Sequence, residues 1–274
     1  FYTDYGINIQ KLFFAHFLKD ENNGWDKRPR VQLQVRHPGE KFVERFEQDW
    51  PLPSTNWTKY YLNYENMTLD EAVPSNLQTI SYDPMGDGVT FTTKPLQHEM
   101  EVTGPMAAKL YVSSDSVDAD LFLVVRAFYP DLKEVVFKGA LDPHTPIAQG
   151  WLRASHRKLD DALTRPDRPY HTHDEKQPLN PGEIYELDIE IWPSCISLPK
   201  GFRIALSVRG RDYVYPGGAD GGLSNMKNKF TGVGPFLHDD PRDRPLDIFG
   251  KTVTLHNTEQ HKSYVLLPVI PKEK

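Results

Sequence analysis

The chain has 274 residues, with 38 acidic residues against 32 lysines and arginines and a formal net charge of −6. This length suffices for one large domain or two small ones that fold without disulfide bonds. The mild acidity and the scattered basic residues argue against nucleic-acid binding. No apolar run reaches the roughly 18 residues of a membrane span. The single cysteine, Cys195, excludes an intrachain disulfide framework and a cysteine-based zinc site.

The first predicted element is an amphipathic helix over Asp4–Lys19. Asp4 can cap its first turn, and apolar residues such as Phe14 and Leu18 recur at helical spacing. Phe13 and Phe17 widen the apolar face. A helix with so wide an aromatic face is expected to pack on an adjacent domain. Since the chain starts at Phe1, without methionine or a signal segment, we expect it to be a piece of a longer polypeptide.

After Gly24 the apolar period changes from helical spacing to two, as in Val31, Leu33 and Val35. Many short strands with abundant turn residues predict a mainly β fold, an antiparallel two-sheet β-sandwich preceded by one helix. The predicted strands cover residues 31–35, 42–46, 59–63, 78–82, 99–103, 107–113, 121–129, 135–140, 150–155, 185–192, 203–210, 251–256 and 263–269.

Two long irregular segments interrupt the predicted strands. Residues 159–181 are rich in proline, and residues 211–249 are rich in glycine and end in charged turns. Loops of this length are uncommon in compact domains and are often functional. We therefore expect these two segments to carry a role beyond connecting strands.

Candidate nucleophiles in the sequence are poor. Ser224 lies in the run GLSNM, which lacks the second small residue, the preceding strand and the following helix of a nucleophile elbow. Cys195 follows Pro193 at the end of a strand, and no neighbour in the sequence would lower the pKa of its thiol. We interpret Cys195 as a buried structural thiol and assign no catalytic residue within the chain.

Histidines and carboxylates raise the question of a metal site. His171, His173 and Asp174 are the best candidates, because alternate residues of an extended segment point to one side. A polar, proline-rich loop more often uses such residues to anchor itself. The loosely calcium-like Asp115, Asp118 and Asp120 lack the central glycine and distant glutamate of a calcium loop, and they predict a solvated hairpin turn. We predict no metal and no cofactor.

The run of alternating charges at residues 238–245 contains one histidine, His238, among aspartates and arginines. A catalytic His–Asp pair and an ion-pair network that pins a long loop are both compatible with this pattern, and the network is the simpler interpretation. Localisation stays undetermined, since the lone Cys195 and the glycosylation sequons at Asn56 and Asn66 do not decide between cytoplasm and secretion.

Six segments together resemble one family. They are GPMAAKLYVSS at 104–114, DADLF at 118–122, GWLRASHR at 150–157, PGE at 181–183, LDIEIWP at 187–193 and KGFRI at 200–204. In order and spacing, over roughly residues 25–270, they are similar to the C-terminal domain of X-Pro dipeptidyl-peptidase-like serine hydrolases of the CocE/NonD type. That group includes cocaine esterase and the α-amino acid ester hydrolases.

The resemblance implies an α/β-hydrolase domain with an inserted helical cap, followed by a C-terminal jelly roll of the galactose-binding-like type. It implies that residues 1–24 hold the last helix of the hydrolase domain and that residues 25–274 form the jelly roll. The catalytic Ser, Asp and His would lie upstream of Phe1, and His16, within the helix, is not the catalytic histidine. On this hypothesis the chain alone is inactive.

Two functional hypotheses follow. In the first, the chain is the non-catalytic domain of a serine hydrolase that cleaves small esters or amides, packs on the hydrolase and cap domains, and helps to wall the active site. In the second, it is a stand-alone carbohydrate-binding or ligand-binding sandwich that stacks ligands on its five tryptophans, Trp25, Trp50, Trp57, Trp151 and Trp192. Nucleic-acid and membrane partners are not expected, and homo-oligomer formation stays open.

Overall fold

The structure is a computed structural model that describes residues 3–75, 77–139, 141–217, 230–235 and 237–272. The chain is mainly β with one long helix at its N-terminal end, as predicted. The elements are α1 (Asp4–Lys19), η1 (Trp25–Lys27), β1 (Val31–His37), β2 (Lys41–Glu47), β3 (Asn56–Asn63), β4 (Thr68–Asp70), β5 (Gln78–Tyr82), β6 (Val89–Thr92), β7 (Met100–Ser114), β8 (Asp120–Phe128), β9 (Glu134–Val135), β10 (Ala148–Arg153), η2 (Ala154–His156), β11 (Tyr185–Leu198), β12 (Arg203–Arg209), α2 (Leu246–Phe249), β13 (Val253–Asn257) and β14 (Tyr264–Ile270).

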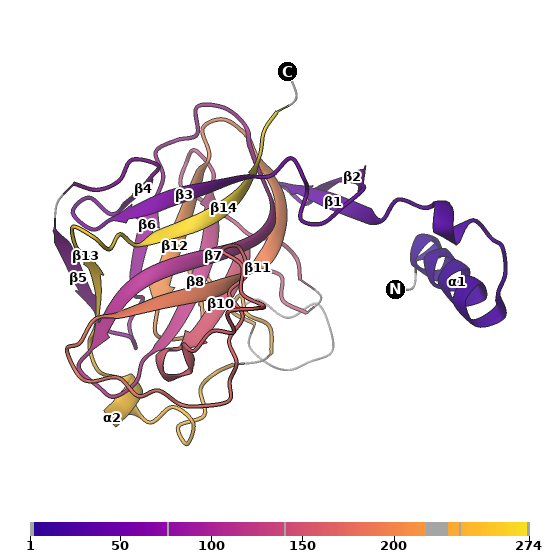
Figure 1. Cartoon of the computed structure of the whole chain (residues 1–274). Coiled ribbons are helices and arrows are strands. Elements are labelled where there is room, and N and C mark those ends of the chain that lie inside the picture. The colour runs from indigo at the N-terminus through magenta and orange to yellow at the C-terminus, as the bar shows by residue number, and fades with distance from the viewer. Residues whose placement is uncertain (1–2, 76, 140, 218–229, 236, 273–274) are drawn as a thin grey trace.

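The strands of the described residues form one connected and strongly curled sheet rather than two separate sheets (Figure 1). Its main order is β10-β8-β12-β6-β4-β3-β14-β7-β11-β1-β2, while β13 joins β5 to β7 and β9 pairs with β8. Most pairs are antiparallel, but β1 runs parallel to β11 and β4 runs parallel to β6, so the sheet is mixed. Alternation along each strand predicts an inner and an outer face, but it does not say which strands pair.

The curl of the sheet brings β10 back beside β11, although these two strands share no ladder. Gly150 on β10 permits this approach, because a Cβ atom there would lie 2.1 Å from the backbone oxygen of Glu190 on β11. The enclosed interior holds a single apolar core built from inward residues of both sides, including Leu110, Leu123 and Ile189.

The longest strand, β7, joins two strands that the sequence predicts as separate. Gly104 and Pro105 look like a break in the sequence, yet β7 runs through them and pairs with β11, β14 and β13. The register of β11 shifts between Ile191 and Ser194, and the register of β14 shifts between Leu266 and Val269, so both neighbours bulge beside Gly104. Gly104 has φ of +146°, and a Cβ atom there would lie 2.8 Å from Cβ of Pro268. The close approach of Pro268 thus explains why position 104 is a glycine.

Other differences from the predicted elements are local. β11 continues through Pro193 to Leu198, and the strand predicted at 135–140 is confined to Glu134–Val135 within the described residues. The short strands β4 and β6 and the helix α2 were not predicted. Elements of three or four residues contain too little periodic pattern to be recognised in a sequence.

The curled sheet has the shape of an open half-barrel, which we call the barrel, and helix α1 projects from it at the end of an arm made by β1 and β2 (Figure 1). Thr3, not Asp4, caps the helix, because the Thr3 side chain accepts a hydrogen bond from the backbone N–H of Gly6 at 3.1 Å. Asp20 ends it in a left-handed conformation. Since β1 meets β11 at a single register pair, Arg36 with Ile196, the arm leaves the barrel almost at once.

Candidate functional site

The arm carries a large unpartnered apolar surface. Among the described residues of α1 none is buried. Phe13 and Phe17 rest against Trp25, with ring centroids 5.3 and 6.4 Å apart, respectively, from that of the tryptophan. Exposure nevertheless reaches 51% at Phe14, 55% at Phe17 and 74% at Leu18. Exposed apolar groups of this size and contiguity mark interaction surfaces.

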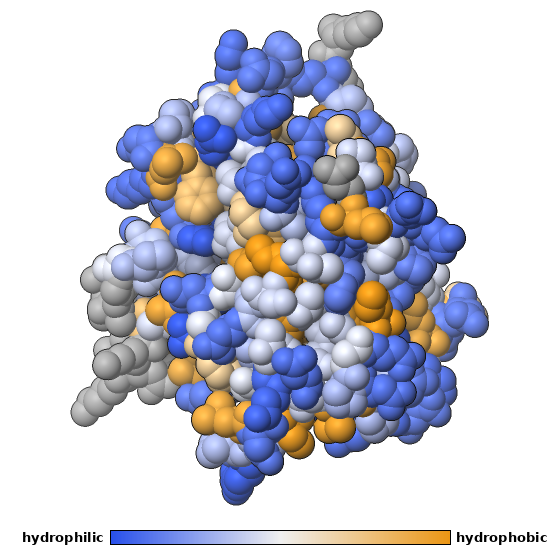
Figure 2. All heavy atoms as spheres, turned by 90° about the vertical axis from the view of Figure 1, so that its left-hand side faces the viewer, coloured by the Kyte–Doolittle hydropathy of each residue, from blue (hydrophilic) through white to orange (hydrophobic). Residues whose placement is uncertain are grey.

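The β2 strand extends this surface, because Phe42, Val43 and Phe46 are also exposed. β2 is the last strand of the sheet, and its outer edge has no neighbouring strand among the described residues. On the opposite side of the molecule apolar residues form small, separate groups among hydrophilic ones (Figure 2). The exposed apolar residues of α1 and β2 lie on the arm, which this view does not face.

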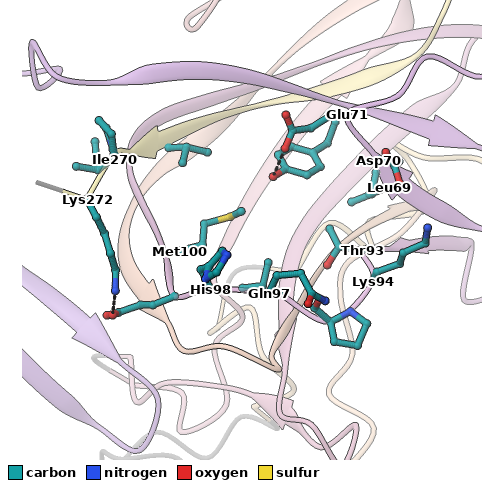
Figure 3. A pocket seen from close by; sticks show the side chains of 16 residues that line it. Leu69, Asp70, Glu71, Thr93, Lys94, Gln97, His98, Met100, Ile270 and Lys272 are labelled. Carbon is teal, nitrogen blue, oxygen red and sulfur yellow. Dashed lines mark hydrogen bonds and ion pairs between the residues drawn. The ribbon is translucent and has the colours of Figure 1, made fainter. Parts of the chain in front are cut away.

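A cleft of about 450 Å³ opens between β4, the connection from β6 to β7, and the end of β14 (Figure 3). Its centre is apolar and includes Met100, while charged side chains stand at the rim. The Tyr60 hydroxyl donates to Glu71 at 3.3 Å, and Lys272 pairs with Glu99 at 2.7 Å. The lining residues offer no serine, no cysteine and no histidine–carboxylate pair. We assign no reaction to this cleft.

His238 forms a pair with a carboxylate, but not with one of the aspartates in its own charged run. Its Nδ1 lies 3.0 Å from Oδ1 of Asp212, and its backbone N–H donates to Oδ2 of Asp212 at 2.6 Å. The ring also packs edge-on against Phe122. Sequence reasoning missed Asp212, which is 26 residues away, because only the fold brings the two residues together. The pair links Asp212, at the start of the 211–249 segment, to the charged run that begins at His238.

Asp120 is the centre of the ion-pair network that the charged run predicts. It accepts hydrogen bonds from Arg153 at 2.8 and 3.0 Å and from Arg244 at 2.8 Å. Arg153 also pairs with Asp243 at 2.9 Å, and Arg244 donates to the backbone oxygens of Gly210 and His238. Side chains of Asp120 and Arg244 are less than a tenth exposed. The network ties the second long segment to β8 and β10.

The prediction that Asp115, Asp118 and Asp120 form a solvated hairpin turn is wrong for Asp120, whose side chain is only 8% exposed. Asp118 accepts hydrogen bonds from the backbone N–H and the hydroxyl of Ser155 at 2.9 and 2.6 Å, and Asp120 is held by arginines. Their carboxylates therefore organise the chain around η2. Within the described ranges, no group of three or more His, Cys, Asp or Glu side chains is arranged to hold a metal ion as it stands.

Of the three predicted metal candidates, Asp174 is engaged apart from His171 and His173. Asp174 turns away to Lys158 at 3.0 Å and Thr172 at 2.5 Å, whereas His173 meets His156, a residue that the sequence pattern did not include. His171 lies nearby, with its ring centroid 6.0 Å from that of His173.

Ser224 and Cys195 are the two residues that the sequence analysis rejected as nucleophiles. Ser224 lies outside the described residues. Cys195 is half-buried, with its sulfur 3.5 Å from Oγ1 of Thr103, and burial raises the pKa of the thiol. A raised pKa leaves less thiolate, the reactive form, so Cys195 has the environment of a structural residue.

The structure brings only one pair of tryptophans together. Trp151 on β10 meets Trp192 on β11 edge-on, with centroids 5.2 Å apart, and Trp192 is 62% exposed. Trp25 packs under α1, and no contact joins Trp50 or Trp57 to another tryptophan in the described structure. The five tryptophans therefore do not form a common stacking surface.

The described residues thus form a curled β-sheet domain with an exposed apolar arm and without an assembled Ser–His–Asp triad. A family model described as the X-Pro dipeptidyl-peptidase C-terminal non-catalytic domain matches residues 23–266. The chain belongs to this family, which confirms the resemblance seen in its sequence.

The solved structures and curated proteins that this chain resembles include hydrolases and esterases. A CocE/NonD family hydrolase from Staphylococcus aureus superposes with a TM-score of 0.83 and 28% identity, over 98% of this chain and 46% of that chain. Cocaine esterase of a Rhodococcus species is 23% identical over 96% of this chain and 46% of its own length. A Mycobacterium bovis protein named as a serine esterase is 34% identical over 45% of this chain and 19% of its own length. The chain thus spans less than half the length of these relatives.

No helix in the described ranges is long and apolar enough to cross a membrane.

Proposed function

We propose that this chain is the C-terminal part of a serine hydrolase that cleaves small esters or amides through an acyl-enzyme. The observation that carries the proposal is the family match, joined to an alignment that covers only 46% of a CocE/NonD hydrolase. The serine nucleophile, its histidine base, the aspartate and the oxyanion hole would lie in the half that precedes residue 1. In this proposal the chain itself packs on the hydrolase and cap domains and helps to wall the active-site cleft.

The proposed domain boundary lies near residue 24. The family model starts at residue 23, just after α1, while the match to the Staphylococcus aureus structure covers 98% of the chain and so includes most of α1. We assign residues 1–24 to the hydrolase domain and residues 25–274 to the C-terminal domain. The opposed sides of the curled sheet would correspond to the two layers of the family's jelly roll.

The hydrolase and cap domains are the proposed partners of the exposed arm. Phe14 and Leu18 need a large apolar partner, and the arm leaves the barrel beside Trp192: Arg36 of β1 donates to Ser194 of β11 at 2.8 Å, two residues beyond that tryptophan. Trp192 is itself 62% exposed near this attachment point. A domain seated there would cover both the arm and Trp192.

The first test uses a fluorophosphonate that labels active serine nucleophiles. We expect the full-length protein to be labelled once per polypeptide and the 274-residue chain to remain unlabelled, because the nucleophile lies outside it. Labelling is measured by intact mass. Stoichiometric labelling of the 274-residue chain would show a nucleophile within it and would contradict the proposal.

We further propose that one of the long segments, 159–181 or 211–249, faces the active-site cleft or the domain interface. Replacing each in turn by a short turn in the full-length hydrolase is expected to change kcat, KM or stability for at least one of the two. The second segment is the stronger candidate, because His238 at its end lies against Trp151, with ring centroids 6.0 Å apart, and Trp151 contacts the exposed Trp192. Unchanged kinetics and stability in both variants would refute this assignment.

A further inference from the structure

His156, just before the 159–181 segment, meets His173 within it. Nδ1 of His156 lies 3.3 Å from Nδ1 of His173, and the ring centroids are 5.5 Å apart. Neither histidine belongs to the exposed arm or to the ion-pair network around Asp120. Their juxtaposition follows from the fold, because 17 residues separate them in the sequence.

The backbone around this pair forms a ladder that holds the two histidines in place. Main-chain hydrogen bonds join Asp160 N to Tyr170 O at 2.9 Å, Thr172 N to Lys158 O at 3.1 Å and Gln177 N to Ser155 O at 2.7 Å. These bonds join residues 155–160 to residues 170–177, on both sides of the histidine pair. The main chain therefore fixes the positions of both histidines.

The separation of the two nitrogens fits two ligands of one metal ion. Zinc–imidazole bonds of about 2.0–2.1 Å in a tetrahedral shell place neighbouring ligand nitrogens about 3.3 Å apart. His173 has φ of +52°, in the left-handed region, where asparagine, aspartate and histidine are enriched among residues other than glycine.

A third imidazole stands beside the pair. The ring of His171 lies 6.0 Å from that of His173, and its Nε2 is buried without a hydrogen-bond partner.

The surrounding charges also suit a cation. Lys158 is paired with Asp174 at 3.0 Å and with Glu175 at 3.6 Å, so these three side chains together carry one net negative charge. The guanidinium of Arg157 is turned to the backbone oxygens of Ala154 and Gln177 and lies over the Tyr185 ring.

We propose that His156 and His173 form a binding site for a divalent transition metal of the Cu²⁺ and Zn²⁺ class. Water would complete the coordination shell, and the ion would recruit His171 as a third ligand through rotation of its ring. Imidazole nitrogens select these metals over Mg²⁺ and Ca²⁺, and Cu²⁺ should bind most tightly among first-row ions. The site is independent of the proposed hydrolysis.

The test measures Cu²⁺ and Zn²⁺ binding to the metal-stripped full-length protein at pH 7.5, by calorimetry and by electron paramagnetic resonance of the Cu²⁺ form. We expect nitrogen hyperfine structure and a dissociation constant that rises at least tenfold in His156→Ala and in His173→Asn. Asparagine is used at position 173 because it tolerates the left-handed backbone. A smaller loss is expected in His171→Ala.

His98→Ala is the matched control, because His98 is exposed on a connection away from this site, at the rim of the cleft in Figure 3. Its dissociation constant should equal that of the parent protein. Unchanged Cu²⁺ and Zn²⁺ binding in the His156→Ala, His173→Asn double variant would place the metal elsewhere and overturn the proposal. So would the absence of binding to the parent protein. Thermal unfolding without metal checks that each variant is folded.

Discussion

A Phe14→Asp substitution is expected to destabilise the full-length hydrolase by about 3 kcal/mol while changing the isolated 274-residue chain by less than about 0.5 kcal/mol. In this structure Phe14 is 51% exposed, so a carboxylate there meets water. Against a hydrolase domain the same change removes a buried phenyl ring and buries an unpaired charge. Urea denaturation of both proteins measures the two free energies of unfolding.

Asn8→Asp is the control for this experiment, because Asn8 is an exposed polar residue of the same helix and receives the same charge. It should leave both proteins within about 0.5 kcal/mol of their parents. Equal effects of Phe14→Asp in the full-length and isolated proteins would contradict docking of this face. Loss of serine labelling is not required for that result, so docking and catalysis are tested separately.

Asp120→Ala is expected to lower the free energy of unfolding of the barrel by about 3 kcal/mol, because it leaves the buried guanidinium of Arg244 without its carboxylate partner, whereas Arg153 keeps Asp243. The carboxylate is 8% exposed and accepts from both Arg153 and Arg244. Breaking a buried pair from one side costs more than the pair contributes. The free energy of unfolding gives the size of the effect, and amide hydrogen exchange should speed up most in residues 237–249, which Arg244 anchors.

Asp240→Ala serves as its control. Asp240 pairs with Arg242 at 2.7 Å, but the arginine side chain is 90% exposed and the aspartate 48% exposed. Solvent-exposed ion pairs contribute little, so this variant should lose less than about 0.5 kcal/mol. Similar losses in Asp120→Ala and Asp240→Ala would mean that the network does not hold the segment.

Local sequence patterns were enough for most strands. Residues 78–82 alternate over a run bounded by turn residues, and β5 covers those same residues. Periodicity is reliable where one face of a strand is buried and the other is not. The predicted break at Gly104 was wrong. A glycine–proline pair usually interrupts a strand, but β7 continues through this pair because its neighbours β11 and β14 bulge beside it.

In the candidate sites, too, the sequence identified single residues but not their partners. The sequence named His238, His171 and His173 as notable residues, but their partners Asp212 and His156 lie 26 and 17 residues away from His238 and His173. Whether two residues so far apart in sequence come into contact depends on the path of the intervening loop, and no local sequence pattern predicts that path. Asp174, adjacent in sequence to His173, instead pairs with Lys158.

The sequence by itself determined that this protein is mainly β with an amphipathic N-terminal helix, and its motifs identified the family, because periodicity and motif order are local properties. Only the tertiary structure decided that the strands join in one curled sheet, since pairing is a non-local choice that depends on close approaches such as Gly150 against Glu190. It also decided that the apolar face of α1 stands clear of the barrel. The sequence predicts that this face is buried, and the structure shows that its partner is not the barrel.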